Sequence, residues 1–467
     1  MNKKLSRRDF LRAGTLTTAG LVVAACGGQT PAEPAAPAEP AEKEKEPEAE
    51  PPAKEGVTVN YWFGWGGSYA GQTWDALKET DEFKEAIGNN TLETKGSAGD
   101  QVLPPAVAAG TPPDGASNVQ YLDFMARDVL VPISDWVATS AIVKKENYLE
   151  GTWNDGFYQG TMYGVPANEG FLRYGLNYNA RMVEEAGLNP DDPPQTWSEC
   201  FAWHEAITQF DDAGNLKQVG FDPFDAMGGQ LAIQDGFYPA VSWNWTWFDS
   251  DAGKFDLDNE MMAEAFEIMG EFYRLIGPDN MAGMRQVEGQ GSWGGSFNTE
   301  VQAMLIEGYW HPGETTIDKP EVAEHNRATW APVPDDRKGV KVQGTGGHYV
   351  IFFKDAQYTE EMFKVAEFLN SNTACDIIFA NGGWLPGLKP FLSTVDSSTY
   401  SGLDFYFKSV DEADEWSSPA RCPITNFSRT QFTELREEVY RDQITAAEAA
   451  AEFQKRCDTE FEQAGFG

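Results

Sequence analysis

The stretch VTVNYWFGWGGSYAGQTWDALKETDEFKEAIGNNTLETK (residues 57–95) indicates the class of fold. Its first seven residues carry no charge and are mostly β-branched or aromatic, which is typical of a buried strand. A helix is expected over residues 72–87, because Gly88 follows as a C-terminal stop signal. TLETK (91–95) and GASNV (115–119) predict two further strands. Strands that alternate with helices predict parallel βαβ units and an α/β fold.

Later segments carry further helix signals. Thr196 and Glu199 have the spacing of a capping box, ahead of a helix expected to run through Thr208. Residues 359–371 place their apolar side chains on one face and predict an amphipathic helix. Thr445 and Glu448 repeat the capping-box spacing and predict the start of a last helix.

The first 25 residues resemble an export signal. Basic residues precede a mostly apolar segment at residues 13–25, which is shorter than the roughly 20 residues that span a bilayer. The motif SRRDFL (6–11) resembles the twin-arginine export signal, and VAAC (23–26) resembles a lipobox. Cys26 is therefore the predicted lipidation site. The alternative is an ordinary cleavage site beside an incidental cysteine.

Residues 26–56 predict a disordered tether. They are rich in Pro, Ala, Glu and Lys and contain no aromatic residue, so they bury too little apolar surface to offset the entropy of ordering. Roughly 30 residues at ~3.1 Å each would reach on the order of 90 Å. We therefore expect an exported protein that a lipid holds on the outer face of the cytoplasmic membrane, at the cell surface or in the periplasm.

Composition limits the class of partner. The formal net charge of −38 argues against nucleic acid, because phosphate binding needs clustered Lys and Arg. Beyond Cys26 the cysteines lie at positions 200, 375, 422 and 457 without a CxxC pair, and both free and paired thiols fit this spacing. The four histidines lack the spacing of a metal site, so we expect no metal.

Motifs for catalysis or cofactor binding are not apparent. Residues 289–294 match GxGxxG, but the preceding MAGMRQVE is no buried strand, so a glycine-rich loop is the better interpretation. The chain has no GxSxG elbow and no phosphate-binding Walker loop. We expect a protein that is not an enzyme and holds no cofactor.

Several segments together resemble the extracellular solute-binding proteins of ABC sugar importers, the group that includes maltose-binding and glycerol-phosphate-binding proteins. The matching segments are AAGTPPD (108–114), MYGVPANEGFLRYGLNYNARMVEEAGLNPDDPPQTWSE (162–199), AMLIEGYW (303–310), WAPVPDD (330–336), QGTGGHYVIF (343–352) and GGWLPGLKPF (382–391). Their order and spacing cover most of residues 57–460.

The resemblance implies a two-lobe periplasmic-binding-protein fold of type II. Each lobe would be discontinuous, with residues 57–167 and 333–383 in lobe 1 and residues 168–332 and 384–467 in lobe 2. The ligand would lie between the lobes, at the carboxyl ends of the strands, and lobe closure about a hinge would capture it. The resemblance further implies a monomer that delivers its ligand to the transmembrane subunits of an ABC permease.

Sugar binding needs aromatic planes for C–H surfaces and polar groups for hydroxyls, and the chain has 15 Trp. Trp310 follows an apolar strand and a glycine, and by resemblance it matches a position where the family places a sugar-stacking Trp; the alternative is a lid on the lobe's own core. Trp65 follows the first strand, where alternation favours it over Trp62 for the cleft. Trp384 follows two glycines at a predicted lobe crossing, where a hinge wedge is the alternative.

Other candidates come from pattern and resemblance. SWNWTWF (242–248) alternates as a strand would, and we expect Trp243 at the cleft and the next two Trp in the core. Gly347 is expected to offer a backbone donor. By resemblance, Asn118 and Gln120 lie in a common ligand-contact region, and Glu169 matches a position that bonds hydroxyls; a solvated hinge carboxylate is the alternative for Glu169.

The sequence therefore predicts a lipid-anchored binding protein for a sugar or oligosaccharide. A secreted carbohydrate-active enzyme and a cofactor-bearing oxidoreductase are the alternatives from another class. A binding protein for a polyol, a glycerol-phosphate-like molecule or a peptide is the alternative within the same class.

Overall fold

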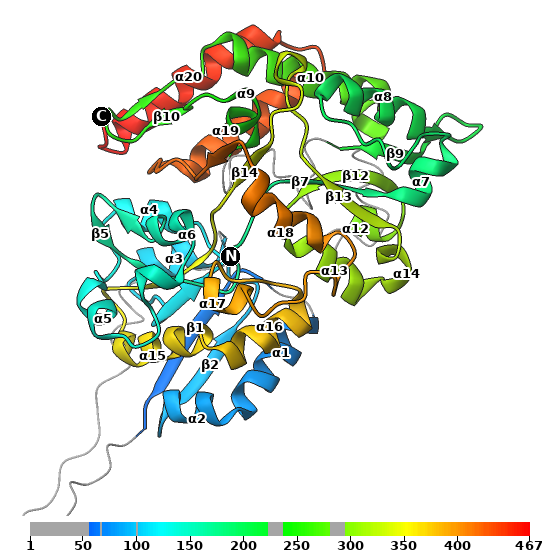
Figure 1. Cartoon of the computed structure of the whole chain (residues 1–467). Helices are drawn as coiled ribbons and strands as arrows, with labels where there is room; N and C mark the ends of the chain where they lie inside the picture. The colour runs from blue at the N-terminus through cyan, green and yellow to red at the C-terminus, as the bar shows by residue number, and fades with distance from the viewer. Residues whose placement is uncertain (1–55, 66–67, 100, 223–236, 281–294) are drawn as a thin grey trace, which may run out of the picture. The chain divides into compact units, whose positions relative to one another are not determined.

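The computed structural model describes residues 56–65, 68–99, 101–222, 237–280 and 295–467 (Figure 1). The predicted signal peptide, Cys26, almost all of the predicted tether and the GxGxxG segment lie outside the described residues. Within the described ranges, no helix combines the length and the hydropathy needed to cross a membrane.

The first sheet has the strand order β2-β1-β3-β15-β6. Its strands are β1 (Thr58–Phe63), β2 (Thr91–Lys95), β3 (Gly115–Ser117), β6 (Gly164–Pro166) and β15 (Tyr349–Phe352). β1 pairs in parallel with β2 and β3, which confirms the predicted βαβ pattern, whereas β15 runs antiparallel to β3 and β6. Val59, Tyr61 and Phe63 alternate along β1 and are buried, so this strand anchors one core.

The helix predicted over residues 72–87 is two helices, α1 (Ser68–Glu79) and α2 (Asp81–Ile87). The break falls at Thr80, whose hydroxyl accepts a hydrogen bond from the Phe83 N–H at 3.1 Å and so caps a new helix. Gly88 ends α2 with φ of 59°, as the sequence predicts. The other helices near this sheet are α3 (Leu103–Ala108), α4 (Tyr121–Ala126), α5 (Ser134–Thr139), α6 (Glu150–Asn154), α15 (Thr359–Leu369) and α16 (Asn372–Gly382).

The second sheet has the strand order β13-β7-β12-β9-β8. Its strands are β7 (Gly175–Asn179), β8 (Gln209–Phe210), β9 (Leu216–Phe221), β12 (Gln302–Glu307) and β13 (Asn326–Thr329). All six residues of β12 are buried, and β12 pairs in parallel with β9 and antiparallel with β7. The associated helices are α7 (Ala180–Glu185), α8 (Trp197–Ile207), α9 (Tyr238–Trp243), α10 (Glu260–Ile276), α12 (Gly295–Asn298), α13 (Trp310–Asp318) and α14 (Pro320–Ala323).

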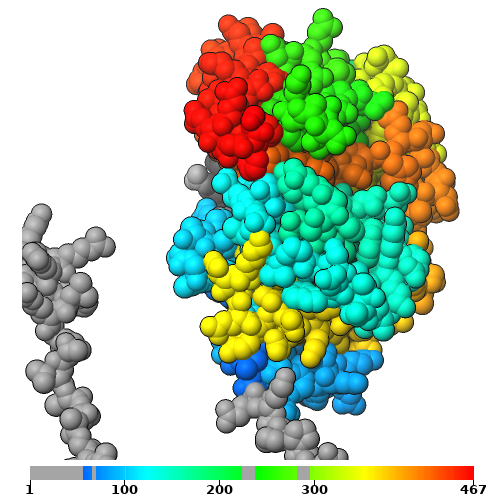
Figure 2. Space-filling view, turned by 90° about the vertical axis from the view of Figure 1, so that its left-hand side faces the viewer, coloured from blue at the N-terminus to red at the C-terminus, as the bar shows by residue number. Residues whose placement is uncertain are grey.

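The C-terminal helices α19 (Thr425–Tyr440) and α20 (Ala446–Gln463) pack with α10 and share the core of the second sheet. Figure 2 shows the red C-terminal residues directly against the green residues of this region. The predicted capping box at Thr445 and Glu448 is confirmed. Side chains of α17 (Lys389–Leu392) and α18 (Leu403–Glu412) join the core of the first sheet instead. The predicted lobe boundaries stay a prediction.

Short strand pairs complete the fold. β14 (Val342–Gly344) pairs in parallel with β16 (Glu415–Ser417), which brings together two segments that are far apart in the sequence. The remaining pairs are β4 (Phe157–Tyr158) with β5 (Thr161–Met162) and β10 (Phe248–Asp249) with β11 (Lys254–Phe255).

The prediction that SWNWTWF forms a strand is wrong. Trp243 is the last residue of α9, which has a proline in its first turn, and Asn244 ends the helix in the left-handed conformation with φ of 59°. The ring of Trp243 is buried and stacks on Trp197 in the core, with ring centroids 6.0 Å apart. Trp247 is buried in this core as predicted, whereas Trp245 is only half-buried against it, so the prediction is wrong for Trp243.

His204 makes the stability of the second sheet's core sensitive to acid. Its Nδ1 accepts a hydrogen bond from the Phe221 N–H at 2.9 Å, and its Nε2 lies 3.1 Å from the Phe272 carbonyl oxygen. Burial lowers the pKa of this imidazole to about 4. Because the folded pKa is below the ordinary value of 6.5, the unfolded chain binds more protons between these two values. The stabilisation is complete above pH 6.5 and is lost as the pH falls toward 4.

We therefore expect His204 to account for a loss of roughly 3 kcal/mol in unfolding free energy over that window. Urea denaturation at pH 7 and pH 5 measures about 2 kcal/mol of this loss, because pH 5 still lies above the folded pKa. His204→Gln should lower stability at pH 7 but reduce the dependence on pH. His325 is a matched control, since it is not fully buried, and His325→Gln should keep the wild-type dependence. An unchanged pH dependence in His204→Gln would show that other groups cause the loss.

Candidate functional site

The carboxyl ends of β1 and β3 border a small cavity, which we call the Glu169 cavity. Its lining residues are Tyr61, Trp65, Trp74, Leu77, Ser117, Ala167, Asn168, Glu169, Leu369, Ile378 and Trp384. The space that a water molecule can enter is about 10 Å³, which is room for about one water. The cavity as described is therefore nearly closed.

Two indole rings form one wall of the Glu169 cavity. Trp65 is half-buried and stacks on Phe63, with ring centroids 4.1 Å apart and planes inclined by 26°. Its ring also contacts the ring of Trp384 edge to face, with ring centroids 4.8 Å apart and planes inclined by 69°. The indole Nε1 of Trp384 donates a hydrogen bond to Glu314 Oε1 at 2.7 Å. The structure thus brings together two predicted site residues that are more than 300 positions apart in the sequence.

The polar side of the cavity centres on the carboxylate of Glu169. Its Oε2 accepts a hydrogen bond from Asn118 Nδ2 at 2.8 Å and lies 3.5 Å from His348 Nε2. Asn118 has φ of 51°, a conformation that asparagine tolerates better than most residues. Gly64 permits this turn, because a methyl group there would lie 1.9 Å from the Asn118 carbonyl oxygen. Asn118 and Glu169, two further predicted site residues, are therefore in direct contact.

Trp310 is packed differently from the prediction. It follows β12 and Gly308 as expected, yet it begins α13 and is only 6% exposed. The guanidinium of Arg173 lies 5.1 Å from the centre of its ring, and a methyl group at Gly308 would lie 2.1 Å from the ring. Its indole Nε1 is buried and finds no hydrogen-bond partner in the part of the chain that the structure describes. Contact between this ring face and a ligand would require Arg173 to move.

Of the predicted site residues, Trp65, Glu169 and Trp384 line the cavity, and the others, including Asn118 and Trp310, do not. A methyl group at Gly347 would lie 2.3 Å from the carbonyl oxygen of Glu169, so this glycine allows two backbone segments to meet. Gln120 is buried at the N-cap position of α4 and makes no capping hydrogen bond with its side chain. Trp243 donates to Glu264 Oε2 at 3.0 Å from its place in the second core.

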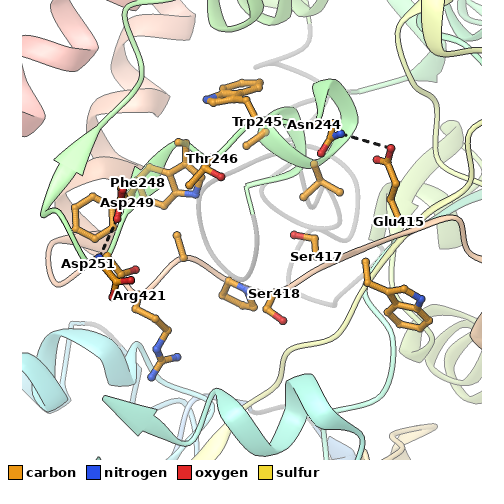
Figure 3. Close-up of a pocket in the computed structure, with 17 residues that line it drawn as sticks. Asn244, Trp245, Thr246, Phe248, Asp249, Asp251, Glu415, Ser417, Ser418 and Arg421 are labelled. Atoms are coloured by element: carbon orange, nitrogen blue, oxygen red, sulfur yellow. Dashed lines mark hydrogen bonds between the residues drawn. The ribbon is translucent and has the colours of Figure 1, made fainter. Parts of the chain in front are cut away.

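A second, larger hollow lies beside α9 and β16, and we call it the Trp245 pocket. Its volume of about 560 Å³ is in the range of small-molecule sites. In Figure 3, Trp245 and Thr246 lie on one side, while Ser417, Ser418 and Arg421 come from a facing segment. The Nε1 of Trp245 donates to the Asp256 carbonyl oxygen at 3.0 Å. Dashed lines in Figure 3 join Asn244 to Glu415 and Asp251 to Asp249.

Arg173 does not line either hollow. Its Nε donates to the Gly346 carbonyl oxygen at 2.9 Å, while its guanidinium faces Trp310. A methyl group at Gly346 would lie 3.1 Å from Pro419, which lines the Trp245 pocket. Arg421 points away from this pocket, toward the Phe157 carbonyl oxygen that accepts its hydrogen bond.

The family model described as bacterial extracellular solute-binding protein matches residues 65–374. The chain belongs to this family. The mixed α/β architecture with two five-stranded sheets is the two-lobe type II periplasmic-binding-protein fold, which confirms the predicted fold class. No curated protein sequence matches this solute-binding protein.

Solved structures share the fold of this solute-binding protein. The protein CpMnBP1 with mannotriose bound is 18% identical, with a TM-score of 0.72, over 86% of this chain and 100% of that one. An ABC transporter solute-binding protein from Thermotoga lettingae TMO, bound with alpha-D-tagatose, is 20% identical, with a TM-score of 0.69, over 86% and 100%. The sugar-binding protein MalE from Xanthomonas citri is 20% identical, with a TM-score of 0.65, over 87% and 98%.

Several residues around the sites of this solute-binding protein were not predicted. Glu314 lies four positions after Trp310, which is one helical turn, but no helix was predicted for this segment. Arg173 and His348 both lie in segments that carry the family resemblance, without a motif of their own. Among the described residues, no group of three His, Cys, Asp or Glu side chains is placed to hold a metal ion.

Proposed function

We propose that the protein binds a sugar or oligosaccharide at the Glu169 cavity and delivers it to an ABC importer. The observation that carries this proposal is the aromatic wall of Trp65 and Trp384 beside the Asn118–Glu169 pair. Indole planes match the C–H surfaces of a sugar ring, and a carboxylate next to an amide matches its hydroxyl groups. Structural neighbours with mannotriose and tagatose bound support this ligand class.

Entry of a sugar requires the cavity to open. A hexose does not fit in about 10 Å³, so the indole of Trp65 must move or the surrounding segments must separate. Trp65 suits such a movement because it is half-buried, whereas Trp384 is only 4% exposed. Closure of the two lobes around the ligand would then reform the wall.

A thermal-shift screen tests this function. Purified protein is heated with mannotriose, maltotriose, tagatose, a polyol, glycerol phosphate and a short peptide in turn. A ligand that binds only the folded state raises the midpoint, by mass action. We expect a shift with at least one sugar, recovered chemically unchanged, because we propose that the protein catalyses no reaction. A shift with the peptide or glycerol phosphate alone would contradict the proposed ligand class.

We propose that the Trp245 pocket accepts the distal units of a longer oligosaccharide. Its volume of about 560 Å³ and its half-buried indole support this extension. Trp245→Ala should weaken binding of a trisaccharide roughly fivefold and leave monosaccharide binding within twofold, since stacking of one ring contributes about 1 kcal/mol.

Isothermal titration calorimetry with matched mono- and trisaccharides measures both effects of Trp245→Ala. Phe210→Ala is the control, because this exposed aromatic residue lies on β8 and does not line the Trp245 pocket. Equal losses for both sugars in Trp245→Ala would mean that the pocket is not a length-dependent extension.

We further propose that a twin-arginine signal exports the protein and that a lipid on Cys26 anchors it as a monomer outside the cytoplasmic membrane. The motif SRRDFL and the sequence VAAC support this proposal, and the family description is of extracellular proteins. A tether of roughly 30 residues would keep the binding lobes near the permease at an effective concentration of about millimolar.

A further inference from the structure

The carboxyl group of Glu314 lies behind the aromatic wall of the Glu169 cavity. Glu314 follows Trp310 by four residues in α13, so both side chains lie on one face of this helix. Glu314 Oε1 accepts the hydrogen bond from Trp384 Nε1 at 2.7 Å, and Oε2 is shielded from solvent and has no hydrogen-bond partner among the described residues. Glu314 does not line the cavity, so its contact with the cavity wall is through Trp384.

Backbone contact holds the two groups together. A methyl group at Gly313 would lie 2.4 Å from the Cα of Gly383, so α13 meets the end of α16 without a side chain between them. Gly383 ends α16 with φ of 73°, a left-handed conformation that favours glycine. Trp384 is the first residue after this turn. The position of the Trp384 ring therefore depends on this contact and on its hydrogen bond to Glu314.

The surroundings of Glu314 favour its neutral form. Burial raises the pKa of this carboxyl group well above its ordinary value, and the charges of Glu169 and Asp318 raise it further, while the hydrogen bond from Trp384 opposes them. The phenol of Tyr309 also interacts with Glu314, and burial raises the pKa of that phenol as well. A neutral carboxyl group still accepts a hydrogen bond from the indole through its carbonyl oxygen.

Leucine at position 314 would cost less free energy of folding than glutamate does, because a buried polar atom without a partner destabilises the fold. The acid is therefore poorly explained by stability. The chain contains a second indole–carboxylate pair for comparison, in which Trp243 donates to Glu264 Oε2 at 3.0 Å away from the Glu169 cavity.

We propose that Glu314 is a positioning residue that holds the Trp384 indole against Trp65, so that the aromatic wall is in place before the ligand arrives. This inference depends on the proposed sugar-binding function for its purpose. It adds a residue that does not contact the ligand but determines how well the wall receives it.

Two measurements test this role in Glu314→Leu and Glu314→Gln. The first is the NMR signal of the Trp384 indole N–H, assigned by its absence in Trp384→Phe. We expect the signal to move with pH in the wild type, to be independent of pH in Glu314→Gln, and to shift upfield in Glu314→Leu because the acceptor is gone. A wild-type signal that is the same in Glu314→Leu would overturn the proposal without any ligand.

The second measurement is calorimetric affinity for the sugar that gives the largest thermal shift. Glu314→Leu should bind at least fivefold more weakly, whereas Glu314→Gln, which keeps the acceptor, should stay within twofold of the wild type. Glu264→Leu is the matched control and should bind like the wild type. Wild-type affinity in Glu314→Leu, or equal losses in both Glu314 variants, would overturn the proposal. If the wild type binds no sugar, the proposed function fails and the NMR result alone decides whether Glu314 positions Trp384.

Discussion

Replacement of Trp65 by alanine is expected to weaken sugar binding at least tenfold, which corresponds to about 1.4 kcal/mol. Trp65 is the half-buried member of the aromatic wall, and it touches both Phe63 and Trp384. A sugar that stacks on its ring would bury much of the remaining indole surface, and this contact is absent after truncation. Calorimetric titration with the sugar found by thermal shift measures the loss.

Phe210→Ala is the control for the Trp65 variant. Phe210 is 43% exposed and lies on β8, in the second sheet, so its removal should leave affinity unchanged. Circular dichroism and the melting midpoint should show that Trp65→Ala still folds. An affinity within twofold of the wild type would remove Trp65 from the site and favour a ligand held entirely on the side of the Trp245 pocket.

Trp310 is a poorer mutational probe than Trp65, although the resemblance assigns it a sugar-stacking role. Its ring is 6% exposed and belongs to the core of the first sheet. Truncation of a buried aromatic residue costs about 3–5 kcal/mol of stability, so a loss of binding in Trp310→Ala would not separate contact from misfolding. Trp310→Phe keeps most of the packing volume and is the better variant.

Local sequence signals predicted the elements that depend on a few neighbouring residues. The strand β1, the stop at Gly88 and the capping box at Thr445 follow from composition and spacing within one segment, and the structure confirms them. The W-x-W-x-W pattern at residues 243–247 predicted a strand wrongly, because an alternation of apolar and polar residues also arises by chance where a helix ends. Pro239 at the start of α9 is a helix-start signal that the prediction did not include.

The assembly of the site was beyond local reasoning. Trp65, Glu169 and Trp384 come from three segments, and no periodicity relates them. The family resemblance supplied the fold that joins them, but it did not supply Glu314, whose contact with Trp384 depends on how α13 meets α16 at Gly313 and Gly383. Such contacts are properties of packing between elements rather than of either segment.

Replacement of Cys26 by serine should move the mature protein almost completely from the membrane to the soluble fraction. The predicted lipid would attach only to the cysteine thiol, and each acyl CH₂ buried in a membrane contributes about 0.8 kcal/mol, so loss of the chains removes the anchor. Cell fractionation followed by mass spectrometry of the amino terminus measures both the location and the modification. Continued membrane retention of the Cys26→Ser protein would contradict lipid anchoring.

A paired Arg7→Lys and Arg8→Lys variant separates export from anchoring. It should accumulate as an uncleaved precursor inside the cell, because the twin-arginine address is read by a receptor. The Cys26→Ser protein should instead be found outside, with its affinity for sugar unchanged, since Cys26 is far in sequence from every residue of the Glu169 cavity. Uptake of the sugar by cells should nevertheless fall, because release from the tether removes the high local concentration of binding protein at the permease.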